Sequence, residues 1–226
     1  MGIGGSIGKA LGPSVHRLAP ELTTNFVHEA LRRAIHGVGP LPGAASAADK
    51  QLAEQHGDVE KAIHEVIENH VRYAGAQGFA TNLGGMVTAA ITIPANISGL
   101  ALLQCRMVAG IAHLRGYDLA DPRVHNAVLG CMLGEETVQT LVRKKKLPAP
   151  PMAIATAPTH DPHLDQVMAA EVTSELLTRV AGKRVAVTVG RRVPVVGGLF
   201  GASADAFATW RIGRYADREL LRRTMR

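Results

Sequence analysis

The residues best suited to chemistry gather in one short stretch, from His113 to His125. It holds two histidines, His113 and His125, and two aspartates, Asp118 and Asp121. An imidazole and a carboxylate close together can exchange a proton with a substrate or bind a metal ion. The same residues suit a structural role, because Asp121 precedes Pro122 in the manner of a helix N-cap. We favour the structural interpretation, keep these four residues as candidate catalytic groups, and predict neither a metal site nor a cofactor.

A second candidate group consists of polar residues inside apolar, glycine-rich segments. Asn96 and Asp205 both stand in such surroundings, and Arg192 precedes the segment that ends near Asp205. A buried carboxylate is costly unless it is paired or hydrogen-bonded. We therefore expect Asp205 to be buried and paired with Asn96 or Arg192. Such a pair would act either as a ligand-binding group or as a structural clasp, and we favour the clasp.

A third group is basic. Arg211, Arg214, Arg218 and Arg222 are spaced by three and four residues, which places them on one side of a helix. Such a stripe can bind an anionic lipid surface, each charge contributing on the order of 1 kcal/mol near it. The alternative is an ordinary solvated helix face.

Two further groups of histidines and carboxylates occur, within residues 64–70 and 160–165. His64 and His70 are six residues apart, so they face different directions on a helix, and the pattern is not the HExxH of zinc hydrolases. We interpret both groups as solvated surface.

Capping residues and apolar periodicity predict the elements that carry these groups. Aspartates at the starts of three stretches, Asp58, Asp121 and Asp161, are typical helix N-caps. Residues 37–48 and 147–159 are rich in Pro, Gly and Ala and are predicted to be connections. Helices are predicted over residues 20–36, from 59 past 71, 95–115, 122–132, 135–146, 162–182 and 203–226, with 185–189 also taken as helical.

Two glycine-rich apolar segments, Leu83–Leu103 and Val193–Ala204, are the least polar parts of the chain. The first is long enough to cross a bilayer. Pro94 and several Asn, Thr and Ser residues argue against an uninterrupted membrane helix. We predict two short buried helices meeting near Pro94, and leave a membrane-dipping hairpin and a true span as alternatives.

Composition narrows the possible functions. The 226 residues fit a single domain, with residues 1–45 forming a Gly/Pro-rich segment and the first helix. The net charge of +6 suits an anionic partner, but aromatic residues are too few for a stacking platform, so we do not expect nucleic acid. Cys105 and Cys131 fit buried, reduced thiols, and no signal peptide is evident, so we expect a cytoplasmic protein.

The order of three motifs resembles the EcsC family. They are the segment from Gly78 to Asn96, the run Ile111-Ala112-His113-Leu114-Arg115-Gly116-Tyr117-Asp118-Leu119-Ala120-Asp121-Pro122, and the segment Arg192-Val193-Pro194-Val195-Val196-Gly197-Gly198-Leu199-Phe200-Gly201-Ala202. The chain departs from the family pattern at Asn96, at Asp205 and around Tyr117. The resemblance implies a setting near a membrane, since the family's namesake accompanies an ABC transporter locus tied to secretion. It implies no catalytic residue.

These observations predict an all-α protein, a compact bundle of roughly eight to ten helices with the two glycine-rich segments packed in its core. The predicted function is non-enzymatic: a membrane-associated or apolar-ligand-binding accessory protein at the inner face of a membrane, with anionic lipid or a protein as its partner. The alternatives are a metal-dependent hydrolase using the Asp118–His125 turn and a structural subunit of a larger assembly. Oligomeric state is left open.

Overall fold

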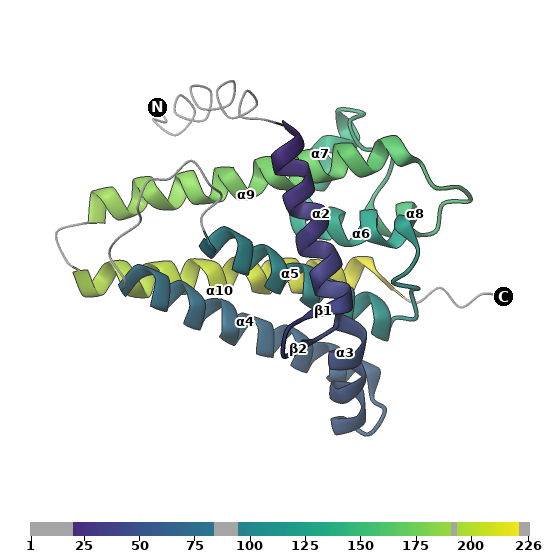
Figure 1. Cartoon of the computed structure of the whole chain (residues 1–226), viewed down its shortest axis with the longest axis horizontal. Helices are drawn as coiled ribbons and strands as arrows, with labels where there is room; N and C mark the ends of the chain where they lie inside the picture. The colour runs from purple at the N-terminus through teal and green to yellow at the C-terminus, as the bar shows by residue number, and fades with distance from the viewer. Residues whose placement is uncertain (1–19, 84–94, 191–193, 222–226) are drawn as a thin grey trace.

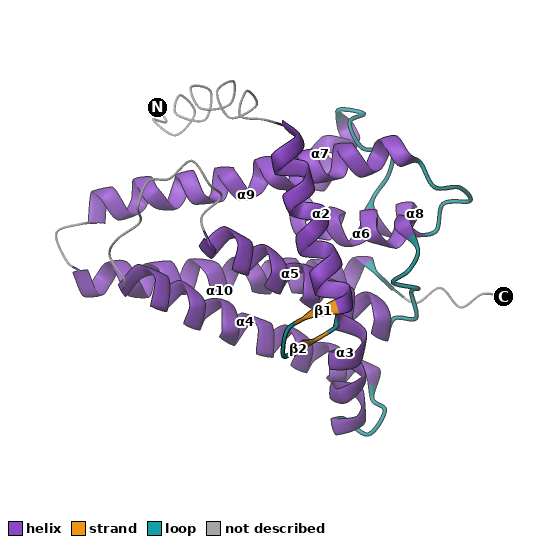
Figure 2. Ribbon diagram, viewed as in Figure 1, coloured by secondary structure: helices purple, strands orange, loops and turns teal. Residues whose placement is uncertain are grey.

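The protein is almost entirely helical. The computed structural model describes residues 20–83, 95–190 and 194–221, with side chains described over 25–76, 99–179 and 203–221. The helices in this part of the chain are α2 (Pro20–His36), α3 (Ala44–Glu54), α4 (Val59–Leu83), α5 (Ala95–Leu114), α6 (Pro122–Leu133), α7 (Glu135–Arg143), α8 (Pro151–Ala155), α9 (Pro162–Gly190) and α10 (Pro194–Glu219). Figure 2 shows them with the small antiparallel hairpin of β1 (Gly37–Val38) and β2 (Leu41–Pro42). The predicted all-α class is confirmed.

Helix starts follow the local chemistry of the sequence. The Asp121 carboxylate accepts a hydrogen bond from the Arg123 amide at 2.8 Å, and Asp161 does the same for the His163 amide at 2.9 Å. Asp58 accepts from the Lys61 amide at 3.1 Å. Each bond satisfies an amide that the first turn of a helix leaves without a partner. The three predicted starts are therefore correct.

Two predicted connections contain helices instead. Residues 37–48 were expected to be irregular, yet the hairpin occupies only Gly37 to Pro42 and α3 begins at Ala44. Ala44 and Ala48 are both buried, so tertiary packing stabilises a helix that Gly and Pro nearby obscure in the sequence. In residues 147–159 the short α8 begins at Pro151, whose fixed φ suits the first helical turn.

The ends of the last two helices also differ from expectation. α9 continues to Gly190 rather than stopping near Gly182, which includes residues 185–189 as predicted. α10 begins at Pro194, not Ser203, and ends at Glu219. The late apolar segment is thus largely the first part of α10, and Pro194 is placed where its missing amide proton costs least.

α5 lies at the centre of the bundle. It packs against α2, α3, α4, α6, α9 and α10, and its buried residues include Cys105, Met107, Val108 and Ile111. Figure 1 shows α4, α5, α9 and α10 along the long axis, with α2 crossing them. α6 completes the core, because every residue from Asn126 to Leu133 is buried.

Glycine allows close helix contact where α10 meets α4 and α5. A Cβ atom on Gly213 would lie 3.0 Å from two carbons of Ile67 and 3.1 Å from the Met107 sulfur. This spacing leaves almost no room for a methyl group, so α10 can approach its neighbours only because residue 213 has no side chain.

The packing of the two glycine-rich segments lies mostly outside the described residues. Residues 84–94 and 191–193 are not described, nor are the side chains of 77–98 and 180–202. The predicted meeting of two helices near Pro94 and the burial of these segments thus stay predictions. Among the described residues, α5 begins at Ala95, and none of the helices is both long and apolar enough to cross a membrane.

Candidate functional site

The side chains of the predicted turn are held by separate structural contacts. His113 Nε2 lies 2.7 Å from the Asp49 carboxylate on α3. Asp118 accepts from the Ala120 amide at 2.9 Å, inside the turn itself. His125 Nε2 contacts the Leu119 carbonyl oxygen at 2.7 Å.

Asp121 is occupied as well. Besides capping α6, it forms an ion pair with Arg123, and hydrogen bonds from that guanidinium hold the pKa of the Asp121 carboxyl below its usual range. Among the described residues no group of three or more His, Cys, Asp or Glu side chains could hold a metal ion. The arrangement therefore gives no support to a metal-dependent reaction at this turn.

One of the two histidine groups is not solvated as expected. His70 on α4 is partly buried and its Nδ1 lies 2.7 Å from the Val66 carbonyl oxygen. His160 pairs with Asp165 at 2.8 Å, and Asp165 also accepts from Asn126 at 2.7 Å. The low exposure of His70 results from packing around α4, which the spacing of the sequence did not reveal.

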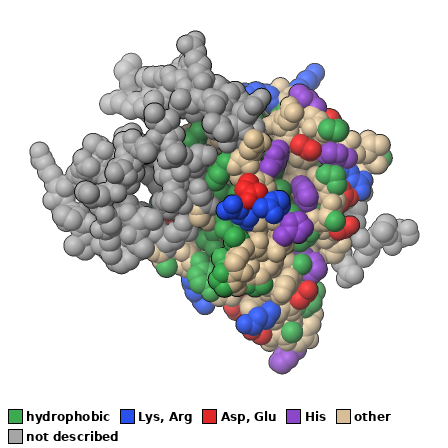
Figure 3. Space-filling model, viewed as in Figure 1, with side chains coloured by type: hydrophobic (Ala, Val, Ile, Leu, Met, Phe, Trp, Pro, Cys, Tyr) green, Lys and Arg blue, Asp and Glu red, His purple; other side chains and the backbone are tan. Residues whose placement is uncertain are grey.

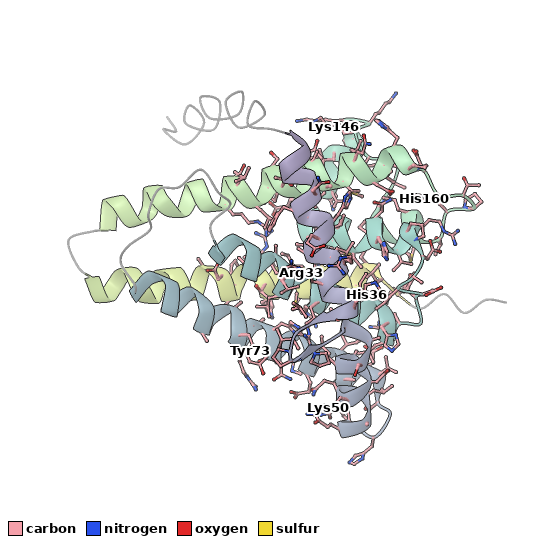
Figure 4. The ribbon with its side chains drawn as sticks, viewed as in Figure 1. Arg33, His36, Lys50, Tyr73, Lys146 and His160 are labelled. Carbon is pink, nitrogen blue, oxygen red and sulfur yellow. The ribbon has the colours of Figure 1, made fainter. Side chains whose placement is uncertain are left out.

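Histidines and charges do not form a single-sign patch on the face shown in Figure 3. In its described part, acidic, basic and histidine side chains are interspersed. Figure 4 shows the labelled basic side chains spread over several elements: Arg33 and His36 on α2, Lys50 on α3, Lys146 in the loop after α7 and His160 in the loop after α8.

α10 contains buried polar groups, and one of them contacts α5. Asp205 is 2% exposed, in agreement with the expected burial, while the side chains of Asn96 and Arg192 lie outside the described residues. Where α5 meets α10, Gln104 donates to Thr209 at 3.1 Å, and both residues are fully buried. A hydrogen-bonded polar pair in a helix interface favours one register of α5 against α10.

The basic stripe is exposed, but its described members are paired. Arg211 lies 3.3 Å from Glu136, Arg218 lies 2.7 Å from Glu135, and Arg214 lies 3.5 Å from Asp217. Arg222 lies outside the described residues. The first two pairs join α10 to the start of α7, a contact that the spacing of the arginines alone could not predict.

Two aromatic side chains extend this surface. Phe207 and Trp210 are 60% and 42% exposed, and their rings stack with centroids 6.0 Å apart. With Arg211, Arg214 and Arg218 they form the outward surface of α10, which we call the α10 face. Their spacing of three residues, in register with the arginines, is the sequence signal that could have identified them.

A cleft of about 470 Å³ lies beside the α10 face. We call it the α7–α10 cleft, because its walls come from the turn between α6 and α7, from α9 and from α10. Four arginines, three glutamates and three aromatic residues contribute to its lining: Arg179, Arg211, Arg214, Arg218, Glu135, Glu136, Glu175, Phe207, Trp210 and Tyr215. Such a lining can hold a group that is anionic at one end and apolar at the other.

A buried arginine connects α10 to α4. Arg115, at the end of α5, is 9% exposed and contacts Glu60 on α4 and Asp217 on α10, the latter at 2.6 Å. Burial would lower the pKa of Arg115, but hydrogen bonds to both carboxylates outweigh it and raise the pKa. The Arg115 network therefore keeps its charge and positions α10.

Fold and surface together define an all-helical protein whose described part combines a basic and aromatic helix face with an adjoining cleft. The model of the EcsC protein family matches residues 4–225, nearly the whole chain, and the protein belongs to this family. The resemblance expected from the sequence motifs is thereby confirmed. Comparisons with curated proteins and with solved structures find no significant match to either.

Proposed function

We propose that this protein is a non-enzymatic accessory that binds peripherally to an anionic membrane surface through the α10 face. The observation that carries the proposal is the pair of exposed, stacked rings of Phe207 and Trp210 directly beside exposed arginines. Aromatic rings favour the interface between head groups and acyl chains, and arginines favour anionic head groups. A helix face that combines both has the chemistry of an interfacial anchor.

The ion pairs of the α10 face do not oppose this role. Arg211 and Glu136 are 51% and 87% exposed on their side chains, and Arg218 and Glu135 are 55% and 46% exposed. Exposed pairs of this kind contribute at most about 1 kcal/mol. The guanidinium groups can therefore exchange a glutamate for a lipid phosphate at little cost.

The charge of the whole chain supports the same setting. A net charge of +6 attracts the protein to an anionic leaflet, and the inner face of a membrane is where such lipids concentrate in cells.

Vesicle sedimentation tests the proposal. We expect binding to vesicles of phosphatidylcholine mixed with phosphatidylglycerol at low salt, and much weaker binding to phosphatidylcholine alone. The double variant Phe207→Ser with Trp210→Ser should lose most of the binding, since each buried ring contributes on the order of 1–3 kcal/mol.

Tyr73→Ser is the matched control, because Tyr73 is an equally exposed aromatic on α4, 63% exposed, away from the α10 face. Equal binding by the control and the double variant would overturn the assignment to α10. No binding of the unmodified chain to either kind of vesicle would overturn the function.

A further inference from the structure

Arg179 is the most enclosed of the four arginines in the α7–α10 cleft. Its Nε donates to Glu175 at 2.9 Å and its Nη2 to the Met132 carbonyl oxygen at 3.1 Å. Its Nη1 is buried and has no hydrogen-bond partner among the described residues. The first two hydrogen bonds hold the Arg179 side chain in place. Its Nη1 group is a buried donor without an acceptor, which is energetically costly, so an acceptor at this position would be stabilising.

Arg214 is the second incompletely paired cation of the cleft. Its partner Asp217 lies 3.5 Å away and is engaged much more closely by Arg115, at 2.6 Å. Arg214 is therefore the most weakly held of the three described arginines on the α10 face. Arg179 and Arg214 line the same cleft, and each has hydrogen-bonding capacity that its described partners use only in part.

The aromatic side of the cleft suits an apolar body. Phe207 and Trp210 line it together with Ile212 and Ala208, whereas Glu135 and Glu136 come from the start of α7 and Glu175 from α9. A ligand with a compact anionic group and an apolar remainder could place the anionic group at the arginines and the remainder against the apolar side chains of α10.

We propose that the α7–α10 cleft binds a phosphoryl group attached to an apolar body, with Arg179 and Arg214 as its anion-binding residues. A phosphoryl group offers three acceptor oxygens and up to two charges, enough for two guanidinium groups, whereas a carboxylate offers two oxygens and one charge. The group can come from a phospholipid head group or from a free phosphate compound. The lipid source rests on the proposed membrane role; the phosphoryl site itself does not.

The chain offers a built-in probe of this cleft. Trp210 is the single tryptophan of the sequence and lines the cleft, so its fluorescence reports on occupancy directly. Titrations would use three probes: dihexanoyl phosphatidic acid below its micelle concentration, dihexanoyl phosphatidylcholine, and inorganic phosphate. We expect a saturable change with phosphatidic acid at concentrations where phosphatidylcholine gives none.

Variants distinguish binding in the cleft from a general effect of positive charge. Arg179→Gln and Arg214→Gln should each weaken binding of dihexanoyl phosphatidic acid about tenfold. Arg33→Gln is the matched control, because Arg33 is an exposed, ion-paired arginine on α2, far in the sequence from the cleft (Figure 4). Glu175→Gln should strengthen binding a few-fold by removing the carboxylate that neutralises Arg179, an effect that misfolding cannot imitate.

Each outcome decides between the possibilities. Saturation by inorganic phosphate as tight as that by phosphatidic acid would support the phosphoryl site and assign it to soluble phosphate compounds. Equal affinity for phosphatidylcholine, or equal losses in Arg179→Gln and Arg33→Gln, would overturn the site. Retained vesicle sedimentation by Arg179→Gln, with loss of the phosphatidic acid response, would show that the cleft and the membrane surface are separate properties.

Discussion

At the scale of single residues, the Arg115 network shows how one buried charge connects three helices. Arg115 lies at the end of α5 and binds Glu60 of α4 and Asp217 of α10. The two carboxylates are not equivalent, because Glu60 is 71% exposed on its side chain and Asp217 only 17%. The loss of stability on removing one charged group of the network therefore depends on whether the charge left behind is buried.

We expect Arg115→Ala to lower the free energy of unfolding by about 3 kcal/mol, because among the described residues it leaves the mostly buried Asp217 with the weaker pairing to Arg214, at 3.5 Å, as its counter-charge. Glu60→Gln should cost less than about 1 kcal/mol, since its carboxylate is largely in water. Urea denaturation of both variants checks the prediction. Equal losses in the two would mean that burial does not govern this network.

His70 should make stability depend on pH. Burial lowers its pKa from 6.5 to about 4, although the hydrogen bond with the Val66 carbonyl acts in the opposite direction. Between these two values the unfolded chain binds a proton that the folded protein excludes, so stability falls as pH falls. The loss should approach about 3 kcal/mol near pH 4.

His70→Gln should flatten this part of the stability profile, measured by thermal or urea unfolding from pH 7 to pH 4. His64→Gln provides the control, because His64 is exposed on the same helix. An unchanged slope in His70→Gln would contradict the assignment.

At the scale of helices, close packing decides where glycine is required. Gly213 of α10 faces Ile67 and Met107 at 3.0–3.1 Å from an added Cβ, whereas at Gly110 of α5 the nearest atoms would be 3.7 Å away. Both residues are inside helices, so their intrinsic preference for glycine or alanine is the same. Only the neighbouring helices distinguish them.

We predict that Gly213→Ala destabilises the protein by about 1–3 kcal/mol through overpacking. Gly110→Ala should be neutral or stabilise by up to about 1 kcal/mol, because alanine favours the helix and the methyl group has room. Thermal unfolding of the pair measures the contrast directly. A destabilised Gly110→Ala with a tolerated Gly213→Ala would show that the interface has been placed wrongly.

At the scale of the whole molecule, the distribution of charge matters more than its sum. Arg211 and Arg218 of the α10 face are balanced locally by glutamates of α7, which reduces the field that the chain's net charge of +6 would otherwise suggest. Membrane affinity in the proposed role then depends on how readily these pairs open.

The double variant Glu135→Gln with Glu136→Gln tests this balance. It raises the formal net charge from +6 to +8 and releases Arg211 and Arg218. Binding to phosphatidylglycerol vesicles should become at least several-fold tighter and more sensitive to salt. The corresponding change at Glu65 and Glu68 on α4 is the control of equal charge, and an equal gain there would indicate a general charge effect.

The helices and many of their boundaries could be predicted because the signals are local. Asp58, Asp121 and Asp161 cap helices through backbone amides two or three residues away, and Gly116, with φ of 85°, follows α5 in the conformation that its lack of a side chain permits. The start of α3 was missed, since the burial of Ala44 and Ala48 against other elements stabilises it there.

The sequence by itself determined the helical class, the family motifs and the alignment of the arginines on α10, because each depends on residues close together in the chain. Tertiary structure alone decided the partners of those arginines, the burial of His70 and the α7–α10 cleft. Arg179 and Trp210 are 31 positions apart and Glu135 and Arg218 are 83 apart, so their proximity depends on how whole helices pack. The spacing of residues along the chain does not predict how whole helices pack, and the proposed site consists of contacts that depend on this packing.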